Sequence, residues 1–432
     1  MLLAWPLQTA LVRIGAQKAS DPCNCGIDHP REWGVGNSGS MISPADLESL
    51  FGRPATGPLA GLVVADLSRV LAGPYATMLL ADMGALVIKV ESPGGDDTRG
   101  WVPPVRDGVG TYYLTANRNK HSIALDFAEP DDLAVLHRII HRADVLVENF
   151  RPGSLAKFGL DAQTLQERHP GLIYASITGF GSKGGADLPG YDLLAQAVSG
   201  LMSVTGDATG EPTKVGAALV DVITGLHTAV GILGALQARG ATGDGDHIET
   251  NLLSSILSGL VNQTSAYVAA DVVPQRMGNE HPSLYPYGPF PTADRQLVLA
   301  IGNDRQFERL CAVLGIPEAS ADERFQTMAA RNSNRVALGT LLVERLRTRG
   351  ADAWFDELRR VGVPCGPIQG VDGGVQLAAD LGLEPIAMAG PAGAGVPTVR
   401  HPISYARASV DYSQAPPALD ADRERVLEWL AG

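Results

Sequence analysis

Hydrophobic and polar positions follow two recurring patterns from residue 58 onward. Short apolar runs rich in Val and Ile are followed by segments in which apolar residues recur at helical spacing, as in 73–83 and 130–142. Strands that alternate with helices predict an α/β fold with a doubly wound, largely parallel, Rossmann-like sheet, whose ligands bind beyond the carboxyl ends of the strands. The apolar runs have the length and composition of buried strands and lie at 61–66, 86–91, 122–126, 144–148 and 172–177.

A second, smaller α/β domain is indicated by the patterns at 296–368. They predict a strand at 296–301, helices at 304–314 and 333–349, and a turn or strand at 362–368. Before them come a long apolar helix predicted for 252–270 and an irregular segment, rich in Pro, Gly and aromatic residues, at 277–294; a final helix is predicted at 420–430. The predicted division is an N-terminal extension at 1–57, a large domain formed by 58–250 and 385–432, a small domain at 280–375, and linkers at 251–279 and 376–384.

Composition and charge narrow the class of protein. The chain has 432 residues, 45% of them hydrophobic, which is enough for a large core and two or three domains. Its formal net charge of -13 argues against nucleic acid or an anionic membrane as a partner. Four cysteines are too few for a disulfide framework, so we expect a cytoplasmic protein. The longest apolar run, 217–236, contains Asp221 and His227 and predicts a buried helix rather than a membrane span.

The first 57 residues differ from the rest and are expected to form an N-terminal extension, flexible over 1–40. Residues 1–20 carry two cations and no acid, but no cleavage pattern of a targeting peptide follows, and a more ordinary start begins at Met41. Cys23, Cys25 and His29 lack a fourth ligand at the spacing of a zinc site. We therefore predict no metal site.

Gly179, Gly181 and Gly184 spell the dinucleotide-binding pattern G-x-G-x-x-G directly after a predicted strand. In that motif the glycines open a helix, whereas further Gly and Pro residues follow here, and no acidic residue closes a second strand about 20 positions on. A nicotinamide or flavin site is therefore rejected. The preferred interpretation is a mobile glycine-rich loop over a site.

Asp221 interrupts a run of small and apolar residues and lies where a helix is predicted to begin. At such a position the free backbone N–H groups and the helix dipole favour an ionised carboxylate. A partly desolvated carboxylate with few charged groups nearby is suited to nucleophilic catalysis. A simple helix N-cap is the alternative interpretation of the position.

Seven runs of the sequence, in one order, resemble the family III CoA-transferases, which include formyl-CoA transferase, carnitine CoA-transferase and, as a divergent branch, α-methylacyl-CoA racemase. They cover nearly everything from residue 58 onward, and no single run is decisive. The runs are VLAGPYATMLLADMGALVIKVESPGGDDTRG (70–100), NRNKHSIALD (117–126), ADVLVENFRPG (143–153), GYDLLAQAVSGLMSVTG (190–206), GAALVDVITGLHTAVGILGAL (216–236), GNEHPSLYPYGPF (278–290) and GVPCGPI (362–368).

The resemblance implies that Asp221 is the nucleophile of a CoA-transferase. Its carboxylate would form an aspartyl anhydride with the donor acyl group and then an aspartyl-CoA thioester, from which CoA passes to the acceptor acid. The substrates implied are an acyl-CoA and a carboxylic acid, with no permanently bound cofactor. The resemblance also implies an interlocked homodimer.

Further site residues are carried over by position. The cations Lys89, Arg99 and Arg118 are additional candidates for phosphate contacts, with a salt bridge as the alternative. Candidates for the acyl site are Asp192, which is also a potential helix cap, and Gly278, Asn279 and His281. Positions that match the family's CoA contacts are Val70, Leu71, Leu125, Asp126, Asn149, Phe150, Arg151, Lys157, Gly190 and Tyr191.

Two positions depart from relatives. The racemase branch has a His where Tyr191 stands, and a Tyr, whose ordinary pKa is about 10, is a poor base at pH 7. Formyl-CoA transferase has a Gln where Leu71 stands, which suggests a longer or less polar acyl group here. The alternatives to CoA transfer are an acyl-CoA racemase or epimerase and a catalytically silent CoA-binding protein. Cys311 and Cys365 are interpreted as structural, and His227 as a core residue.

Overall fold

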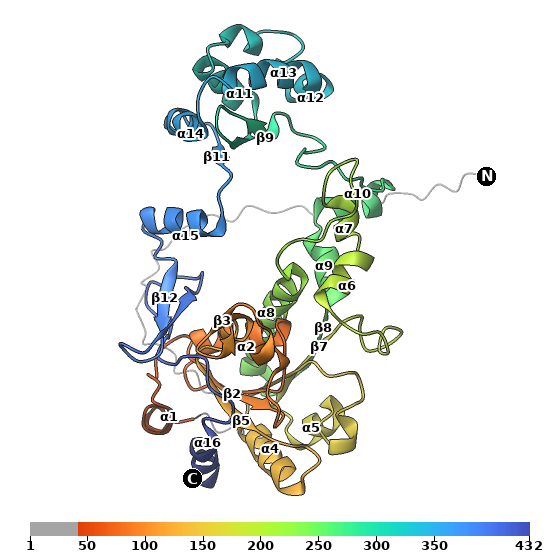
Figure 1. The fold of residues 1–432 in the computed structure, drawn as a ribbon. Helices are drawn as coiled ribbons and strands as arrows, with labels where there is room; N and C mark the ends of the chain where they lie inside the picture. Colours follow the sequence, from red (N-terminus) through yellow and green to blue (C-terminus); the bar gives the residue numbers. More distant parts are fainter. Residues whose placement is uncertain (1–41) are drawn as a thin grey trace, which may run out of the picture. The chain divides into compact units, whose positions relative to one another are not determined.

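The computed structural model describes residues 42–432, so Met41, Cys23, Cys25 and His29 lie outside the described residues. A six-stranded parallel sheet with the order β5-β2-β1-β6-β7-β8 organises the first part of the described chain (Figure 1). In chain order this is 3-2-1-4-5-6, the doubly wound order, which confirms the predicted fold class. The strands are β1 (Val63–Asp66), β2 (Leu86–Glu91), β5 (Lys120–Ala124), β6 (Val145–Glu148), β7 (Ile173–Thr178) and β8 (His247–Asn251).

Two hydrophobic cores cover the two faces of this sheet. Successive side chains of a strand point to opposite faces, and accordingly Val145 and Val147 of β6 enter one core while Leu146 enters the other. Helices α2 (Ala72–Asp82) and α8 (Leu219–Thr242) belong to the first core, and α4 (Pro130–Arg142) and α5 (Ala162–Arg168) to the second. Gly225 lets α2 and α8 approach closely, because a Cβ there would lie 2.6 Å from the Ala72 carbonyl oxygen.

Helix α8 is long and apolar enough, by length and composition alone, to cross a membrane. A third of its most apolar window is buried inside the protein. The buried side, which includes Thr228 and Ile232, packs toward the sheet. The structure therefore supports the predicted core helix on one side and leaves the other side exposed.

Both ends of the described chain complete the large domain. Leu47 and Phe51 of α1 (Pro44–Phe51) and Trp429 of α16 (Arg423–Ala431) lie in one core. A buried ion pair joins Arg53 to Asp411 with an N–O distance of 2.9 Å. Residues 42–57, which the predicted division assigned to an N-terminal extension, therefore pack on the large domain, because the apolar side of α1 is buried against the C-terminal segment.

The small domain has a core of its own. Three antiparallel strands, in the order β11-β10-β9, pack with helices through residues such as Leu299, Phe307 and Leu342. The strands are β9 (Tyr287–Pro291), β10 (Gln296–Ala300) and β11 (Cys365–Pro367), and the helices are α11 (Asp304–Val313), η3 (Pro317–Ser320), α12 (Met328–Ser333), α13 (Arg335–Leu346) and α14 (Ala351–Arg360).

Several predicted elements differ from the structure. The helix predicted for 252–270 is two helices, α9 (Leu252–Gly259) and α10 (Asn262–Ala270), because Val261 has φ 45° and interrupts the helical backbone. The segment predicted as irregular contains β9, and α15 (Val371–Asp380) extends into a predicted linker. The remaining elements are η1 (Asp97–Gly100), β3 (Val105–Arg106), β4 (Val109–Gly110), α3 (Thr111–Leu114), η2 (Ala156–Phe158), α6 (Asp192–Val198), α7 (Leu201–Val204), β12 (Ile386–Ala389) and β13 (Val396–Val399).

Candidate functional site

The loops after β1 and β6 meet where the strand order of the sheet reverses. The Asn149 side chain joins them: its Oδ1 accepts a hydrogen bond from the Arg69 backbone N–H (3.0 Å), and its Nδ2 donates to the Arg69 carbonyl oxygen (2.7 Å). Doubly wound sheets bind ligands in the crevice at this switch point. The geometry therefore places a ligand site beside Asn149.

A cavity at this switch point contains the candidate nucleophile and most of the predicted CoA contacts. Leu71 and Leu252 contribute apolar walls, and the side chain of Tyr191, 60% exposed, lies at its surface. The structure brings together in this cavity Val70, Leu71, Asn149, Phe150, Arg151, Gly190, Tyr191, Asp192 and Asp221.

A neighbouring cavity contains the other predicted contacts from the loop after β5. Leu125 and Asp126 line it, and it shares Arg69, Asp97 and Phe150 with the first cavity. Lys157 is exposed and its Nζ lies 4.7 Å from the ring centroid of Phe158, which lines this second cavity. The two cavities together can hold an elongated ligand with an aromatic base at one end and a reactive group near Asp221 at the other.

Val70 has a strained backbone in this site. Its φ is 70°, a conformation that β-branched residues rarely adopt. Its N–H points to the carboxylate of Asp96, at 3.3 and 3.4 Å from the two oxygens, and Lys89 Nζ donates to Asp96 at 3.0 Å and to the Ser68 carbonyl oxygen at 3.0 Å. The buried Lys89 therefore positions this loop.

The other two cationic candidates also form ion pairs within the protein. Arg99 pairs with Glu91 at 2.7 Å and Arg118 with Asp82 at 2.5 Å, with the carboxylates fully buried rather than on the surface. Arg69, which was not predicted as a site residue, lines both cavities with a side chain that is 59% exposed and lies 3.5 Å from the equally exposed carboxylate of Asp97. The sequence could have indicated Arg69 through its position directly before Val70, in the loop after the first strand.

Asp221 lies in the first turn of α8 and is 9% exposed. Its carboxylate accepts no hydrogen bond from residues 42–432. Burial, with a further contribution from the nearby carboxylate of Asp192, raises the pKa of Asp221 to about 7. We expected the helix terminus to keep this carboxylate ionised, with few charged groups nearby. This expectation is wrong, because the carboxylate of Asp192 occupies the same terminus.

Asp192 is the cap of α8, although it belongs to another helix. Its Oδ1 accepts from the backbone N–H groups of Val220 (2.8 Å) and Asp221 (3.2 Å), while the N-cap residue Ala218 makes no side-chain hydrogen bond. Neither alternative interpretation holds: Asp221 is not the N-cap, and Asp192 does not cap its own helix α6. Asp221 is thereby left with a free carboxylate.

The glycine-rich segment after β7 forms a closed loop that ends in α6. Gly179 and Gly190 meet at its neck, where a Cβ on Gly179 would lie 2.5 Å from the Gly190 Cα. Residues inside the loop, among them Gly181 and Leu188, line the cavity with Asp221. The next helix begins at Asp192, so the G-x-G-x-x-G pattern does not open a helix, in agreement with the rejected dinucleotide interpretation.

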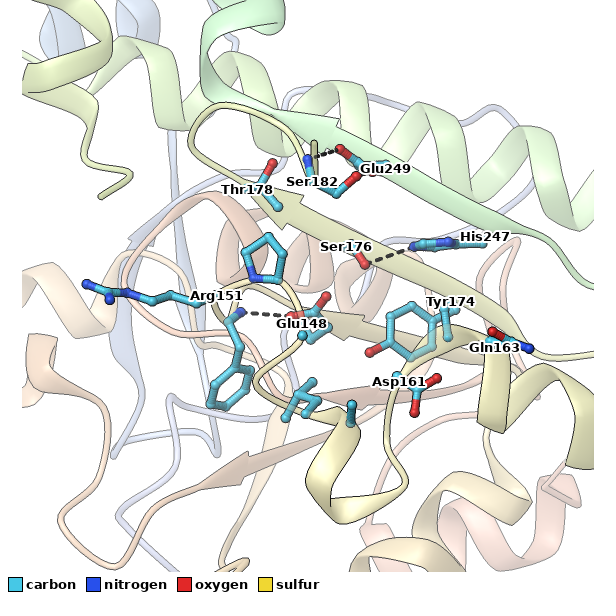
Figure 2. A pocket seen from close by; sticks show the side chains of 16 residues that line it. Glu148, Arg151, Asp161, Gln163, Tyr174, Ser176, Thr178, Ser182, His247 and Glu249 are labelled. Carbon is cyan, nitrogen blue, oxygen red and sulfur yellow. Dashed lines mark hydrogen bonds between the residues drawn. The ribbon is translucent and has the colours of Figure 1, made fainter. Parts of the chain in front are cut away.

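A third cavity, shown in Figure 2, adjoins the loop that carries Phe150 and Arg151. Glu148 Oε2 accepts from the Phe150 N–H at 2.8 Å, and the pKa of Glu148 is raised by burial. On its far side Glu249 accepts from the backbone N–H (2.8 Å) and the hydroxyl (2.6 Å) of Ser182. Glu148 and Glu249, which line this cavity, therefore each hold one of the two loops that line the Asp221 site.

Three of the residues predicted for the acyl site do not line the cavity that contains Asp221. They are Gly278, Asn279 and His281, which precede β9. His281 Nδ1 accepts from the backbone N–H groups of Ser283 (3.1 Å) and Leu284 (3.2 Å), which fixes a local turn.

Cys311, Cys365 and His227 lie outside the cavity that contains Asp221. Cys311 is buried, and burial raises its pKa to about 12; Cys365 lies in β11, and burial raises its pKa to about 11, so neither thiol is activated. His227 is exposed on α8, and its prediction as a core residue is wrong because it falls on the unburied side of that helix.

The fold and the site define a doubly wound α/β protein with a free, buried carboxylate in the ligand crevice of its sheet. The model of CoA-transferase family III matches residues 59–423, and the chain belongs to this family. The predicted family is confirmed, and the protein is a CoA-transferase.

Relatives agree with this assignment. The chain is 40% identical to the succinate--glutarate CoA-transferase of Agrobacterium fabrum, over 86% of this chain and 96% of the relative. It is 41% identical to the human succinyl-CoA:glutarate CoA-transferase, over 73% of this chain and 74% of the relative. A crystal structure of a CAIB/BAIF family protein from Brucella suis matches with a TM-score of 0.78 and 40% identity, covering 87% of this chain and all of that one.

Proposed function

We propose that the protein transfers CoA from an acyl-CoA donor to a carboxylic acid through covalent intermediates on Asp221. The observation that carries the proposal is the free carboxylate of Asp221 in the same cavity as the positions expected to contact CoA. Burial removes solvating water from a carboxylate and makes its ionised form a better nucleophile.

Four steps account for the reaction. The Asp221 carboxylate attacks the donor thioester carbonyl, the C–S bond breaks, and an aspartyl anhydride and CoA thiolate form. The thiolate attacks the aspartyl carbonyl, which releases the donor acid as its carboxylate and leaves an aspartyl-CoA thioester. The acceptor carboxylate displaces the thiolate to form a second anhydride. The thiolate then attacks the acceptor acyl carbon and frees Asp221.

Charge repulsion at the carboxylate pair favours acylation. Ionised Asp221 and Asp192 repel each other, as the raised pKa of Asp221 reflects. Acylation removes the charge of Asp221 and with it this repulsion. Asp192 keeps the N–H groups of Val220 and Asp221 occupied, so the oxyanion of each tetrahedral intermediate is stabilised by other donors.

The substrates we propose are short dicarboxylic acids and their CoA thioesters. Relatives are named for succinate, glutarate and mesaconate. The cavity that contains Asp221 has apolar walls from Leu71, Trp101 and Leu252, which suit the carbon chain of such acids better than a one-carbon acyl group.

Trapping with hydroxylamine tests the intermediates. Purified protein is incubated with succinyl-CoA and hydroxylamine, and peptides are analysed by mass spectrometry; the expected result is a hydroxamate on Asp221. Asp221→Asn is the control and should give neither label nor transfer. Binding of CoA thioester without a label, or turnover by Asp221→Asn, would overturn the proposal and favour a silent binding protein or another mechanism. A mass-spectrometric screen of donors and acceptors then identifies the acids.

The residues that line this cavity do not favour racemase activity. Among the described residues that line it there is no His, and Tyr191 stands at the position of the racemase base. Exchange of the α-proton of an acyl-CoA with solvent deuterium, without CoA transfer, would be the result that favours this alternative.

We also propose that the protein is a homodimer. Leu226, Val230 and Leu233 form an exposed apolar stripe on α8, and exposed apolar patches of this kind commonly mark interfaces. Light scattering of the full chain should give twice the monomer mass, and Val230→Asp should reduce it. A monomer mass at micromolar concentration would contradict this proposal. Exposed apolar side chains on α6 that would extend the interface are Leu193, Leu194 and Val198.

A further inference from the structure

Six basic side chains gather in one hollow outside the Asp221 site. Helix α4 provides four of them, and the end of α5 with the residue after it provides the others; Leu430 of α16 closes the hollow. The chain as a whole has a net charge of -13, so a hollow lined by bases alone among its charged residues is unusual for this protein. This α4–α5 basic hollow consists of His137, Arg138, His141, Arg142, Arg168 and His169.

Three of these side chains are fixed by backbone carbonyl groups. Arg138 Nη2 donates to the Leu430 carbonyl oxygen at 2.7 Å, and Arg142 donates to the carbonyl oxygen of Trp429. His137 Nε2 lies 3.2 Å from the Phe158 carbonyl oxygen. These contacts hold the walls of the hollow in place, so its shape is set before a ligand arrives.

The other three side chains keep their donors free. Arg168, His141 and His169 make no side-chain hydrogen bond or ion pair with residues 42–432. The rings of His141 and His169 lie with their centroids 5.1 Å apart. The negative end of a helix dipole attracts cations, which explains why basic residues lie at the ends of α4 and α5. It does not provide acceptors for the side-chain N–H groups of Arg168, His141 and His169.

The electrostatic environment of the hollow is cationic. The pKa of His169 is lowered by burial and by its basic neighbours His141, Arg168 and His137. The acids on or capping the same elements are Asp161, the N-cap of α5, whose pKa is lowered mainly by hydrogen bonds from Thr164 and to a small extent by Arg168, together with Asp131 and Asp132 at the opposite end of α4, Glu167 on α5, and Glu424 and Glu428 on α16. None of these acids, nor the terminal carboxylate, forms an ion pair with the six bases in the described part of the chain.

We propose that the α4–α5 basic hollow binds a small ligand that carries a diphosphate or triphosphate group, at a site separate from Asp221. Guanidinium groups bind phosphate oxygens bidentately, and His side chains add donors that strengthen when protonated. None of the six bases lines the three cavities at the carboxyl edge of the sheet, so a ligand can occupy the hollow while acyl-CoA occupies its own site.

Calorimetric titration of the full chain with inorganic pyrophosphate, and in a second arm with ATP, tests the proposal at pH 6.5 and low salt. The double variant Arg168→Gln/His169→Asn should bind roughly tenfold more weakly or worse, as expected for the loss of one or more charge-assisted hydrogen bonds. Arg347→Gln, an exposed arginine in the small domain, is the matched control and should bind as the wild type does. Affinity should fall from pH 5.5 to pH 8 because protonated His binds the anion more tightly, and the lowered pKa of His169 places its contribution at the acid end of this range.

Three results would overturn the proposal. The first is no heat of binding for either anion, and the second is equal binding by the wild type and the double variant. The third is binding that Arg69→Gln removes and the double variant does not, which would place the anion in the CoA crevice. Circular dichroism of each variant excludes misfolding, and the titration does not depend on transferase activity, so it stands apart from the proposed reaction.

Discussion

Asp221 and Asp192 are carboxylates from two helices that share the amino end of α8. Asp192 takes the backbone N–H groups, and Asp221 is left free and buried with its pKa raised to about 7. The sequence allowed the position of Asp221 in a first helical turn to be predicted from apolar spacing. It could not reveal Asp192 as the cap, because the two residues are 29 positions apart and only the tertiary fold brings them together.

Activity should depend on pH in the neutral range. The ionised form of Asp221 is the nucleophile, so kcat/KM for acyl-CoA should rise about tenfold between pH 6 and pH 8. In Asp192→Asn the amide oxygen can still accept the Val220 N–H while the negative charge is absent, and the midpoint should move to lower pH. Initial rates across this range measure both effects. An unmoved midpoint would contradict the contribution of Asp192.

The same pKa predicts a stability difference. The folded-state pKa of Asp221, about 7, exceeds its ordinary value of 3.8, so the folded protein binds more protons between these values. The free energy of unfolding therefore falls as pH rises from about 4 to 7. Asp221→Asn removes this loss and should be more stable than the wild type at pH 8, by up to about 4 kcal/mol. Urea unfolding at pH 8 and pH 4 measures it, and the two proteins should match at pH 4.

At the scale of elements, the strands and helices of the sheet were the most predictable part. The helix at 130–142 has the predicted bounds, because an apolar side and a Pro at its first position define it in the sequence. Strand β8 was missed, since its side chains are half-buried or exposed and its residues, His247–Asn251, include few apolar ones. The break at Val261 was missed as well, because nothing in a run of apolar residues marks a positive φ.

The neck of the glycine-rich loop gives a test at this scale. Gly190→Ala would place a Cβ 2.7 Å from the Gly179 Cα, so the neck must open and the wall of the Asp221 cavity must move. We expect a loss of stability of about 1–3 kcal/mol and a lower kcat/KM for acyl-CoA. Gly184→Ala, in the same loop, has nothing within 4 Å of its Cβ and should behave as the wild type. Equal kinetics of the two variants would contradict the close contact at the neck.

At the scale of the molecule, the large domain is assembled from segments at both ends of the described chain. Asp411 accepts two hydrogen bonds from Arg53, at 3.0 and 2.9 Å, and His121 lies 3.1 Å from Asp422. The predicted division already assigned residues 385–432 to the large domain. The partners of this segment were not predicted, because ion pairs between residues 358 positions apart leave no local pattern.

Removal of one partner of the buried pair should be costly. Asp411→Asn leaves the Arg53 guanidinium buried without its counter-charge, and we expect a loss of about 3–5 kcal/mol in the free energy of unfolding. The exposed pair of Arg359 and Asp356 is the matched control, and Asp356→Asn should cost less than about 1 kcal/mol. Guanidinium unfolding curves measure both. Similar losses in the two variants would contradict a special role of the buried pair.

The joining of the two ends has a consequence for biosynthesis. A ribosome synthesises the sheet strands β1 to β8 well before it makes Asp422 and Trp429. In the nascent chain Phe51 therefore lacks its contact with Trp429, and His121 lacks Asp422, for the time needed to translate more than a hundred codons. The large domain can complete its core only after α16 has left the exit tunnel. A premature stop codon anywhere in the small domain therefore yields a sheet that chaperones must shield or proteases remove.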